Sequence, residues 1–336
     1  MSALHSYRLR LRRRAWKLRA FRKRRELRSV VNRTRGLRPG DTLAFTTLRN
    51  ERVRLPYFFD YYRKQGVNHF LMVDNDSDDG SAEWLRDQPD VSLWTTPASY
   101  KAAHFGVDWL NWLQWRYGHG HWSLVVDVDE FFVYPFCDTR PIRALTDWLD
   151  ASEVRSFGAM LLDMYPKGSL SAQPYREGQN PFDIACWFDG GNYSIKRNPE
   201  MLNLWIQGGP RARTFFADAP ERAPALNKIP LVKWNRGYAY VSSTHMLLPR
   251  GLNQTYDEWG GEKPSGVLLH AKFLDTFSQK SAEELSRGQH YADSAEYKAY
   301  AGGLEQDPDL WTKWSERYIN WRQLEIIGLM SKGNWA

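Results

Sequence analysis

The sequence has few cysteines and no long apolar run. Cys137 and Cys186 match no metal-binding spacing and do not require an oxidising compartment. No apolar segment approaches the roughly 20 residues that span a bilayer, and the basic N-terminus leads into no apolar segment typical of a secretory signal. The sequence also lacks a Gly-x-x-x-x-Gly-Lys loop and a Gly-x-Gly-x-x-Gly turn, which argues against P-loop NTPases and dinucleotide dehydrogenases.

Acidic residues are almost missing from the first 40 positions. This segment holds 15 Lys and Arg against the single acid Glu26, a net charge of +14, whereas the whole chain carries +7. The remaining residues are therefore acidic overall, with a net charge of −7. The sequence predicts an acidic domain that carries a basic arm.

The basic arm, residues 1–40, has the pattern of an amphipathic helix. Its apolar residues recur in steps of three and four, which gives one apolar stripe on a helix otherwise covered with cations. Such a helix favours an anionic membrane surface and predicts a cytoplasmic protein, peripheral on the inner face of the cell membrane. There are three alternatives for this arm. It could be a solvated disordered tail, an organelle transit peptide, although it has few serines, or an arginine-rich arm for nucleic acid, which is the least favoured partner. The stripe comprises Leu4, Tyr7, Leu11, Ala15, Leu18 and Phe21.

Strand-like and helix-like segments alternate from Asp41 onward. This pattern predicts an α/β fold with a mostly parallel, doubly wound sheet and helices on both faces. We expect a domain over residues 41–280 and a C-terminal helical extension over 281–336 that packs on it. In that extension Asp307 would cap a helix whose apolar line ends before Gly328. The expected strands are Thr42–Leu48, His69–Asp74, Val91–Thr95 and Trp122–Val126, the expected helices are Val53–Gln65, Ser81–Asp87 and Tyr100–Tyr117, and the C-terminal line is Leu310, Trp314, Tyr318, Trp321 and Leu324.

Acidic residues follow three of the expected strands. The first strand leads into Arg49-Asn50-Glu51, the second into an Asp-rich loop that starts at Asp74, and the fourth into Asp127-Val-Asp129-Glu130. The carboxyl ends of parallel strands meet at one edge of a sheet, where ligands bind. On a regular strand, Asp127 and Asp129 would share one face. Two hard oxygen ligands in that position suit Mn²⁺ or Mg²⁺ with open positions for phosphate oxygens.

Taken together, these motifs resemble a family 2-type glycosyltransferase with the GT-A fold, and more narrowly the bacterial branch with an Arg-Asn-Glu first loop and an Asp-x-Asp-Glu-Phe motif. The resemblance covers roughly residues 42–275, with the motifs in the expected order. The motifs are Thr47-Leu-Arg49-Asn50-Glu51, Val73-Asp74-Asn75-Asp76-Ser77-Asp78-Asp79-Gly80, Asp127-Val-Asp129-Glu130-Phe131, Gly208-Gly209-Pro-Arg211-Ala-Arg213, Asn227-Lys228-Ile-Pro230, His245 and Leu269-His270-Ala-Lys272-Phe273.

The resemblance implies transfer of a sugar from a nucleotide-sugar donor, with a UDP-sugar favoured, to a glycan or lipid-linked acceptor in surface polysaccharide or glycolipid synthesis. It implies that Asp129 binds the metal, that Asp127 faces the ribose or the metal, and that His270, with His245 as second choice, completes the metal shell. The residues that would line the nucleotide pocket are Thr47, Arg49, Glu51, Asp74, which would accept from the base, and Asp76 in the same loop.

Two further groups of residues have candidate roles in this chemistry. Arg211, Arg213 and Lys228, with Lys101 as a weaker candidate, are cations that could hold the phosphates of the leaving nucleotide. An inverting displacement also needs a carboxylate that takes the proton of the acceptor. Asp189, in a Gly-rich turn, is the first candidate for this base, and Glu130 and Asp163 compete with it. Whether the reaction inverts or retains the anomeric configuration stays open.

Two other classes of function fit parts of the same pattern. A nucleotidyltransferase uses a similar sheet and metal-binding acids, but it would release pyrophosphate instead of a nucleoside diphosphate. A non-catalytic protein that binds RNA or membranes through residues 1–40 would use the α/β domain only as a scaffold.

Overall fold

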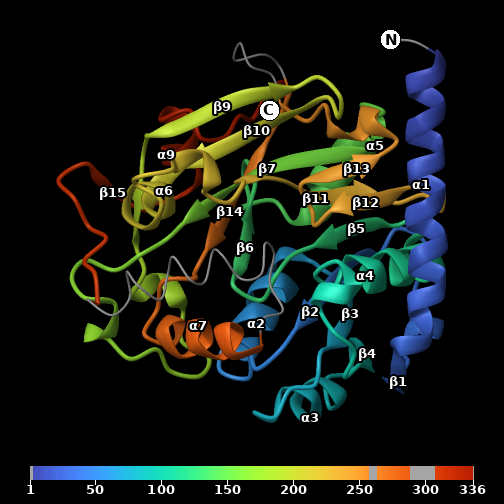
Figure 1. Cartoon of the computed structure of the whole chain (residues 1–336), viewed down its shortest axis with the longest axis horizontal. Coiled ribbons are helices and arrows are strands. Elements are labelled where there is room, and N and C mark those ends of the chain that lie inside the picture. Colours follow the sequence, from blue (N-terminus) through green and yellow to red (C-terminus); the bar gives the residue numbers. More distant parts are fainter. Residues whose placement is uncertain (1–2, 257–262, 288–306, 336) are drawn as a thin grey trace.

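A nine-stranded mixed sheet forms the centre of the molecule (Figure 1). The structure is a computed structural model, and it describes residues 3–256, 263–287 and 307–335. In spatial order the strands are β1 (Arg28–Val31), β4 (Val91–Thr95), β3 (His69–Asp74), β2 (Thr42–Leu48), β5 (Trp122–Val125), β11 (Asn227–Lys233), β7 (Ser156–Asp163), β14 (Gly266–His270) and β6 (Glu130–Val133).

The four expected strands form the parallel part of this sheet. β2 pairs in parallel with β3 on one side and with β5 on the other, and β3 pairs in parallel with β4. The order of these strands reverses between β2 and β5. At such a switch point the loops that follow the two strands diverge and leave a crevice at the carboxyl edge, which is where ligands bind in open α/β sheets.

The other part of the sheet is largely antiparallel, so the prediction of a mostly parallel sheet is wrong. β11 runs antiparallel to both β5 and β7, β6 runs antiparallel to β14, and β1 runs antiparallel to β4. Only β7 and β14 pair in parallel in this part. Of these strands, β11 and β14 lie in the second half of the chain, β6 and β7 follow the four expected strands, and β1 lies in the basic arm, so none of the five is among the strands that the sequence predicted.

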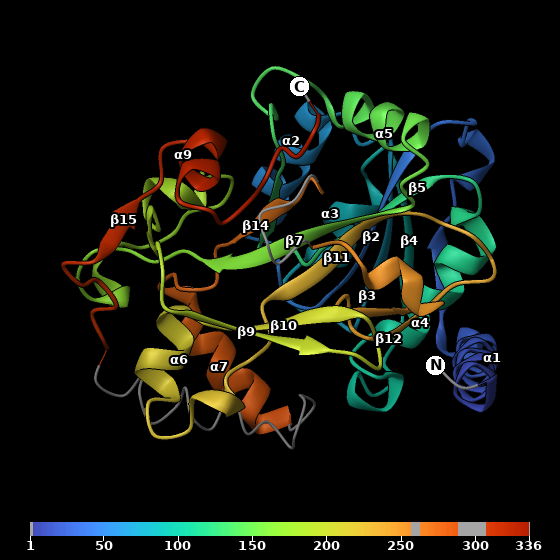
Figure 2. The ribbon, with the colours of Figure 1, turned by 90° about the horizontal axis from the view of Figure 1, so that it is seen from above.

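Helices cover both faces of the sheet, as expected for an α/β fold (Figure 2). On β2, Ala44 and Leu48 face α2 (Leu55–Gln65), α3 (Ser81–Arg86) and α5 (Ile142–Ala151). Leu43 and Phe45 face α4 (Val107–Leu113) and the hairpin of β12 (Ala239–Ser242) and β13 (Met246–Leu248). This alternation is that of a strand buried on both sides.

The helix expected over Tyr100–Tyr117 is interrupted. A 3₁₀ helix over Lys101–Ala103 ends where His104, Phe105 and Gly106 all have positive φ angles, and α4 begins only after them. A π-helical turn, Gln114–Gly118, then follows α4. Left-handed backbone ends a helix, so the apolar spacing alone overestimated the length of this one.

The basic arm folds onto the rest of the chain. Its first part forms α1 (Ala3–Lys23), a helix as predicted, which packs against α4 and the β12–β13 hairpin. Its second part includes β1, an edge strand of the main sheet. Within the part of the chain that the structure describes, no helix has the length and apolar character to cross a bilayer.

The predicted C-terminal helix over residues 307–328 does not form. Asp307 accepts hydrogen bonds from Ser169 and Ser171 instead of capping a helix. β15 (Ser315–Arg317) pairs with β8 (Trp187–Asp189), and only α9 (Trp321–Ile326) is helical. Trp314 has 77% of its surface exposed, so the apolar line does not share one buried face. The remaining elements are the hairpin β9 (Tyr193–Asn198) and β10 (Asn203–Gly208), and the helices α6 (Gly209–Phe215) and α7 (Thr276–Arg287).

Candidate active site

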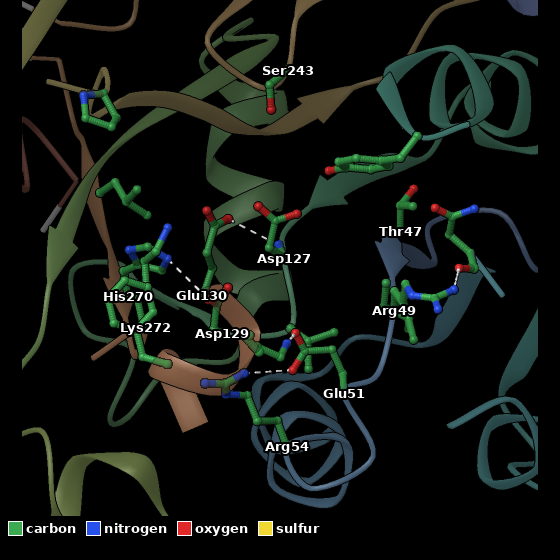
Figure 3. A pocket seen from close by; sticks show the side chains of 18 of the residues that line it. Thr47, Arg49, Glu51, Arg54, Asp127, Asp129, Glu130, Ser243, His270 and Lys272 are labelled. Atoms are coloured by element: carbon green, nitrogen blue, oxygen red, sulfur yellow. Dashed lines mark hydrogen bonds and ion pairs between the residues drawn. The ribbon is translucent and has the colours of Figure 1, made fainter. Parts of the chain in front are cut away.

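A cleft of about 310 Å³ opens at the carboxyl edge of the sheet, beside the switch point between β2 and β5 (Figure 3). Its walls come from the ends of β2, β6, β11 and β14, from α6 and from α7. Seven Lys and Arg side chains and five Asp and Glu side chains line it. This excess of cations, in a cleft whose walls also carry acidic and His side chains, favours an anionic ligand.

Asp127 and Asp129 lie in the turn between β5 and β6, and the expectation that they share one strand face is wrong. The Glu130 backbone NH donates to the Asp127 carbonyl over 3.0 Å and closes the turn. The side chain of Val128 is buried between them. Figure 3 shows Asp129 on the side of His270 and Asp127 on the side of Thr47. The turn therefore presents the two carboxylates to different parts of the same cleft.

His270 lies between two carboxylates. Its Nε2 is 3.3 Å from Asp129 Oδ2, and its Nδ1 is 2.7 Å from Asp163 Oδ1. The register of β7 against β14 places Asp163 directly opposite His270. Arg211 on α6 donates to the other oxygen of Asp163 over 2.7 Å. The result is a chain of alternating charge from Arg211 through Asp163 and His270 to Asp129, in which the first three residues are buried and Asp129 is partly exposed to the cleft.

The charges in this chain shift the pKa values of its members. Burial raises the pKa of Asp163, but Arg211 and His270 outweigh it and lower that pKa to about 2. Burial likewise opposes the positive form of His270, and Asp129 and Asp163 together raise its pKa. The pKa of Asp129 is lowered because the charge of His270 outweighs the effect of burial. Asp163 therefore stays ionised and accepts the Nδ1 hydrogen, which directs Nε2 toward Asp129 and the cleft.

The donors at this edge fit a divalent cation in part. Asp129 and His270 offer an oxygen and a nitrogen side by side, and Asp163 orients the imidazole as carboxylates orient metal-bound histidines. In the described ranges, however, no three His, Cys, Asp or Glu side chains converge as a ready metal site, because Asp127 turns away from the other two. Two protein ligands suffice for Mg²⁺ or Mn²⁺ when phosphate and water oxygens complete the shell.

Glu130 and Lys228 form a buried ion pair next to this chain. Lys228 Nζ on β11 lies 2.7 Å from Glu130 Oε1 and 3.7 Å from Asp127 Oδ2. Burial alone would lower the pKa of Lys228, but the two carboxylates outweigh it and raise that pKa. Reduced hydration inside the cleft and the charge of Glu130 raise the pKa of Asp127 above its ordinary value. The Asp127 side chain keeps 57% of its surface exposed, so it is the carboxylate most open to a ligand.

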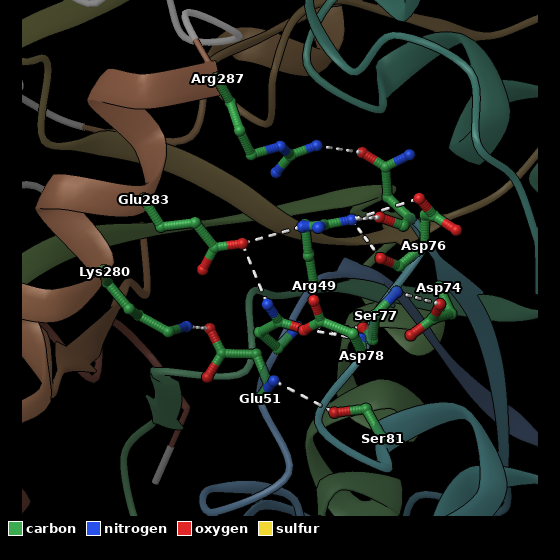
Figure 4. A network of polar contacts seen from close by, with 12 residues as sticks. Arg49, Glu51, Asp74, Asp76, Ser77, Asp78, Ser81, Lys280, Glu283 and Arg287 are labelled. Atoms are coloured by element: carbon green, nitrogen blue, oxygen red, sulfur yellow. Dashed lines mark hydrogen bonds and ion pairs between the residues drawn. The ribbon is translucent and has the colours of Figure 1, made fainter.

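Helix α7 holds the loop that follows β2 through ion pairs (Figure 4). Glu283 accepts from Arg49 Nε over 2.9 Å and from the Asn50 side chain over 3.0 Å. Lys280 pairs with Glu51, which also pairs with Arg54 Nη1 over 3.0 Å. Two residues expected to line a nucleotide pocket, Arg49 and Glu51, therefore lie in the cleft wall and are engaged by α7.

The Asp-rich loop after β3 turns its acids away from the cleft. Asp74 is buried, and its Oδ1 accepts from the Ser77 backbone NH over 3.0 Å. Asp76 is exposed and lies 3.7 Å from Arg49 Nη1. Neither lines the cleft, whereas Asn75 between them does, and Arg287 on α7 donates to its side-chain oxygen. Burial raises the pKa of Asp74, which has one carboxylate oxygen without a partner among the described residues.

Several predicted site residues lie elsewhere. The carboxylate of Asp189 on β8 accepts two hydrogen bonds from Arg213, over 2.8 and 3.0 Å, and one from Tyr165. Neither Asp189 nor Arg213 lines the cleft. Arg211 and Arg213 are two apart on α6, so they leave the helix in different directions. Lys101 is exposed and also lies outside the cleft lining.

His245 reaches the cleft wall but is held by the backbone. Its Nδ1 donates to the Asn227 carbonyl over 2.6 Å. Burial, together with the nearby charge of Lys228, lowers its pKa to about 4. His245 is therefore neutral at physiological pH, and among the described residues no hydrogen bond or ion pair joins it to Asp129 or His270.

Sequence reasoning assigned no role to five charged residues of the cleft. No motif marks the three on α7, because this helix lies at the boundary between the expected domain and its extension. Lys272 belongs to the motif that contains His270, and Arg54 precedes α2 directly after the Arg-Asn-Glu loop, so position in or next to a motif was the available signal for these two. The five are Arg54, Lys272, Lys280, Glu283 and Arg287.

Comparison of the chain with models of known families finds no match, and a search of curated proteins finds no similar sequence. The resemblance in the motifs therefore stays a prediction, and the geometry of the cleft carries the functional argument.

Proposed function

We propose that the chain is a metal-dependent glycosyltransferase of GT-A type that moves a sugar from a nucleoside-diphosphate sugar, with UDP favoured, to an acceptor hydroxyl of a glycan or lipid-linked saccharide. The observation that carries this proposal is the Asp129–His270–Asp163 chain in a cation-rich cleft at the switch point of the sheet. This combination supports the proposal because a divalent ion and a diphosphate would find suitable partners there side by side.

The residues of the cleft divide between the parts of such a donor. The diphosphate would lie near Asp129, where Lys272 and Arg54 add positive charge. Arg54 Nε is a buried donor without a partner among the described residues, and a phosphate oxygen would satisfy it. The nucleoside would lie toward Thr47 and Asn75, where the buried Thr47 hydroxyl also has no partner in the described ranges.

A bound Mn²⁺ or Mg²⁺ would be held by Asp129 and His270, and it would supply positive charge against the departing diphosphate. Asp163 keeps the His270 imidazole in the tautomer that turns Nε2 to the cleft. Lys228 and Arg211, both buried and paired with acids, fix the positions of Glu130 and Asp163. The carboxylate that takes the acceptor proton is then one of the cleft acids, because the ion pair with Arg213 removes Asp189 from consideration.

Release of nucleoside diphosphate tests the proposal. The full chain is incubated with UDP-, GDP- and CDP-sugars, Mn²⁺ and simple saccharide acceptors, and free nucleoside diphosphate is measured. We expect release by the wild-type chain, and a loss of about 100-fold or more in Asp129→Asn, because the variant would lose a ligand of the metal ion whose positive charge stabilises the leaving diphosphate. Asp147→Asn is the matched control, since Asp147 is an exposed acid on α5.

Two results would contradict this function. Pyrophosphate release from nucleoside triphosphates without any sugar transfer would identify a nucleotidyltransferase. Full activity of a folded Asp129→Asn protein would show that the cation site does not lie at Asp129.

A further inference from the structure

Helix α1 uses opposite faces for two different tasks. At 100° per residue, Leu9, Trp16 and Ala20 share one face and the predicted apolar stripe occupies the other. A surface helix ordinarily turns its apolar stripe toward the domain. In this protein the domain holds the helix by the other face, and the large apolar side chains of the stripe stay exposed. Figure 1 shows α1 at the edge of the molecule.

The inward face fixes the helix firmly. Leu9 and Trp16 pack on a cluster that includes Met201, Val241 and Leu248, and Ala20 is buried. Arg19 forms a 2.7 Å ion pair with the buried carboxylate of Asp108 on α4. These contacts make α1 a rigid part of the surface, so the orientation of its outward face is set by the fold.

The outward face is an apolar ridge. The side chains of Leu4, Tyr7, Leu11, Leu18 and Phe21 are between 44% and 60% exposed, and they make up half of the ten exposed large apolar residues of the described chain. Contiguous exposed apolar surface of this kind marks a site of interaction. Two Trp rings, Trp112 and Trp115, lie stacked near its C-terminal end, where Phe21 contacts Trp112 edge-on.

Arginines lie beside the ridge and on it: Arg8 and Arg12 are on one side, Arg10 is on the other, and Arg14 and Arg22 share the face of the ridge. The exposed cations of α1 are Arg8, Arg10, Arg12, Arg14 and Arg22. The only acid of the first 40 residues, Glu26, already accepts from Lys23 and from the Trp109 indole. Beside the ridge, a groove of about 460 Å³ between α1 and the turn after β13 is lined by Arg10, Arg13, Arg14 and Arg250.

We propose that this face of α1 docks on an anionic phospholipid bilayer, with the ridge between the acyl chains and the arginines on the lipid phosphates. Charge complementarity selects this occupant. A second copy of the chain would bring two rows of arginines together, and nucleic acid would leave the apolar ridge uncovered. A bilayer with anionic headgroups can cover the apolar ridge and also bind the arginines. Helix α1 has the residue composition of helices that lie in the membrane interface. The inference does not depend on the reaction in the cleft.

Flotation with vesicles tests the proposal on the full chain. Vesicles of phosphatidylcholine alone are compared with vesicles that also contain phosphatidylglycerol. We expect recovery only with the anionic vesicles, and less recovery at high salt. Leu11→Gln with Leu18→Gln should weaken binding about 25-fold, since each half-exposed leucine contributes about fivefold. Arg10→Gln with Arg14→Gln should give a similar loss, at about fivefold per charge.

Matched controls separate docking from general surface effects. Ile319 and Ile326 are 72% and 84% exposed elsewhere on the protein, so Ile319→Gln with Ile326→Gln removes equivalent apolar surface away from α1. This control should bind as the wild type does, and the melting temperature of each variant should stay unchanged. Wild-type binding by the Leu11/Leu18 variant would overturn the proposal. The proposal would also be overturned if the protein did not bind anionic vesicles but instead formed a dimer that depends on Leu11 and Leu18, or bound RNA.

Discussion

The buried ion pair between Lys228 and Glu130 leads to a quantitative prediction. The two side chains are only 7% and 2% exposed, and they lie 2.7 Å apart. Lys228→Met leaves the Glu130 carboxylate buried without its cation, which we expect to lower the free energy of unfolding by about 3–5 kcal/mol. Glu130→Met is milder, by about 1–3 kcal/mol, because Lys228 keeps Asp127 at 3.7 Å. The double variant removes both charges, and it should come within about 2 kcal/mol of the wild type.

Urea denaturation followed by tryptophan fluorescence measures these differences, with a common slope for all variants. Lys64→Met is the control, because Lys64 forms an exposed pair with Asp60, and its loss should cost less than about 1 kcal/mol. If Lys228→Met had the same free energy of unfolding as the control variant, the reasoning would be refuted, and Lys228 would be expected only to bind phosphate. A double variant less stable than both single variants would show that the two charges do not compensate each other.

Three further predictions concern the groups around the cleft. With chelator present, urea unfolding should show that His270→Gln lowers the free energy of unfolding most between about pH 4 and 6.5. The pKa of His270 is raised in the folded state, so its contribution to stability is complete below its ordinary pKa of 6.5 and is lost as the pH rises through the folded value. The pKa of Asp163 is lowered, so its contribution to stability is complete above its ordinary pKa of 3.8 and is lost as the pH falls toward 2. A cost independent of pH would contradict this assignment. Glu283→Gln should raise UDP affinity about two- to tenfold in calorimetry, because it loosens α7 from Arg49, whereas weaker binding would mean that Glu283 itself holds the nucleotide. Asp189→Asn should lower the free energy of unfolding by about 2–3 kcal/mol and leave UDP affinity unchanged, and the reverse pattern would restore Asp189 to the site.

The parallel strands and the cleft edge were predictable because their signals are local. Short apolar runs, separated by segments with the apolar spacing of helices, predict β2 to β5. The acids that follow β2 and β5 lie in the cleft because these two strands are neighbours in the sheet. The pairing of His270 with Asp163 could not be read in the same way. It depends on the register of β7 against β14, two strands more than 100 residues apart, and no sequence period reports such a register.

The errors have physical causes of the same kind. Asp127 and Asp129 lie in a tight turn, and the period of a strand does not apply to a turn. Asp189 looked accessible in its Gly-rich setting, but β15 and α6 cover it from distant parts of the chain. On α1 the helix itself was predictable. Which of its faces packs on the domain depends on complementarity to α4 and the β12–β13 hairpin, which the helix sequence does not contain.

The most direct test of the central claim is calorimetric titration of UDP into the wild-type chain and into Asp129→Asn, each with and without Mn²⁺. If Asp129 and His270 hold a cation against a diphosphate, Mn²⁺ should strengthen UDP binding about tenfold or more in the wild type and have little effect in the variant. Equal enhancement by Mn²⁺ in both proteins, or UDP binding by neither, would contradict the account.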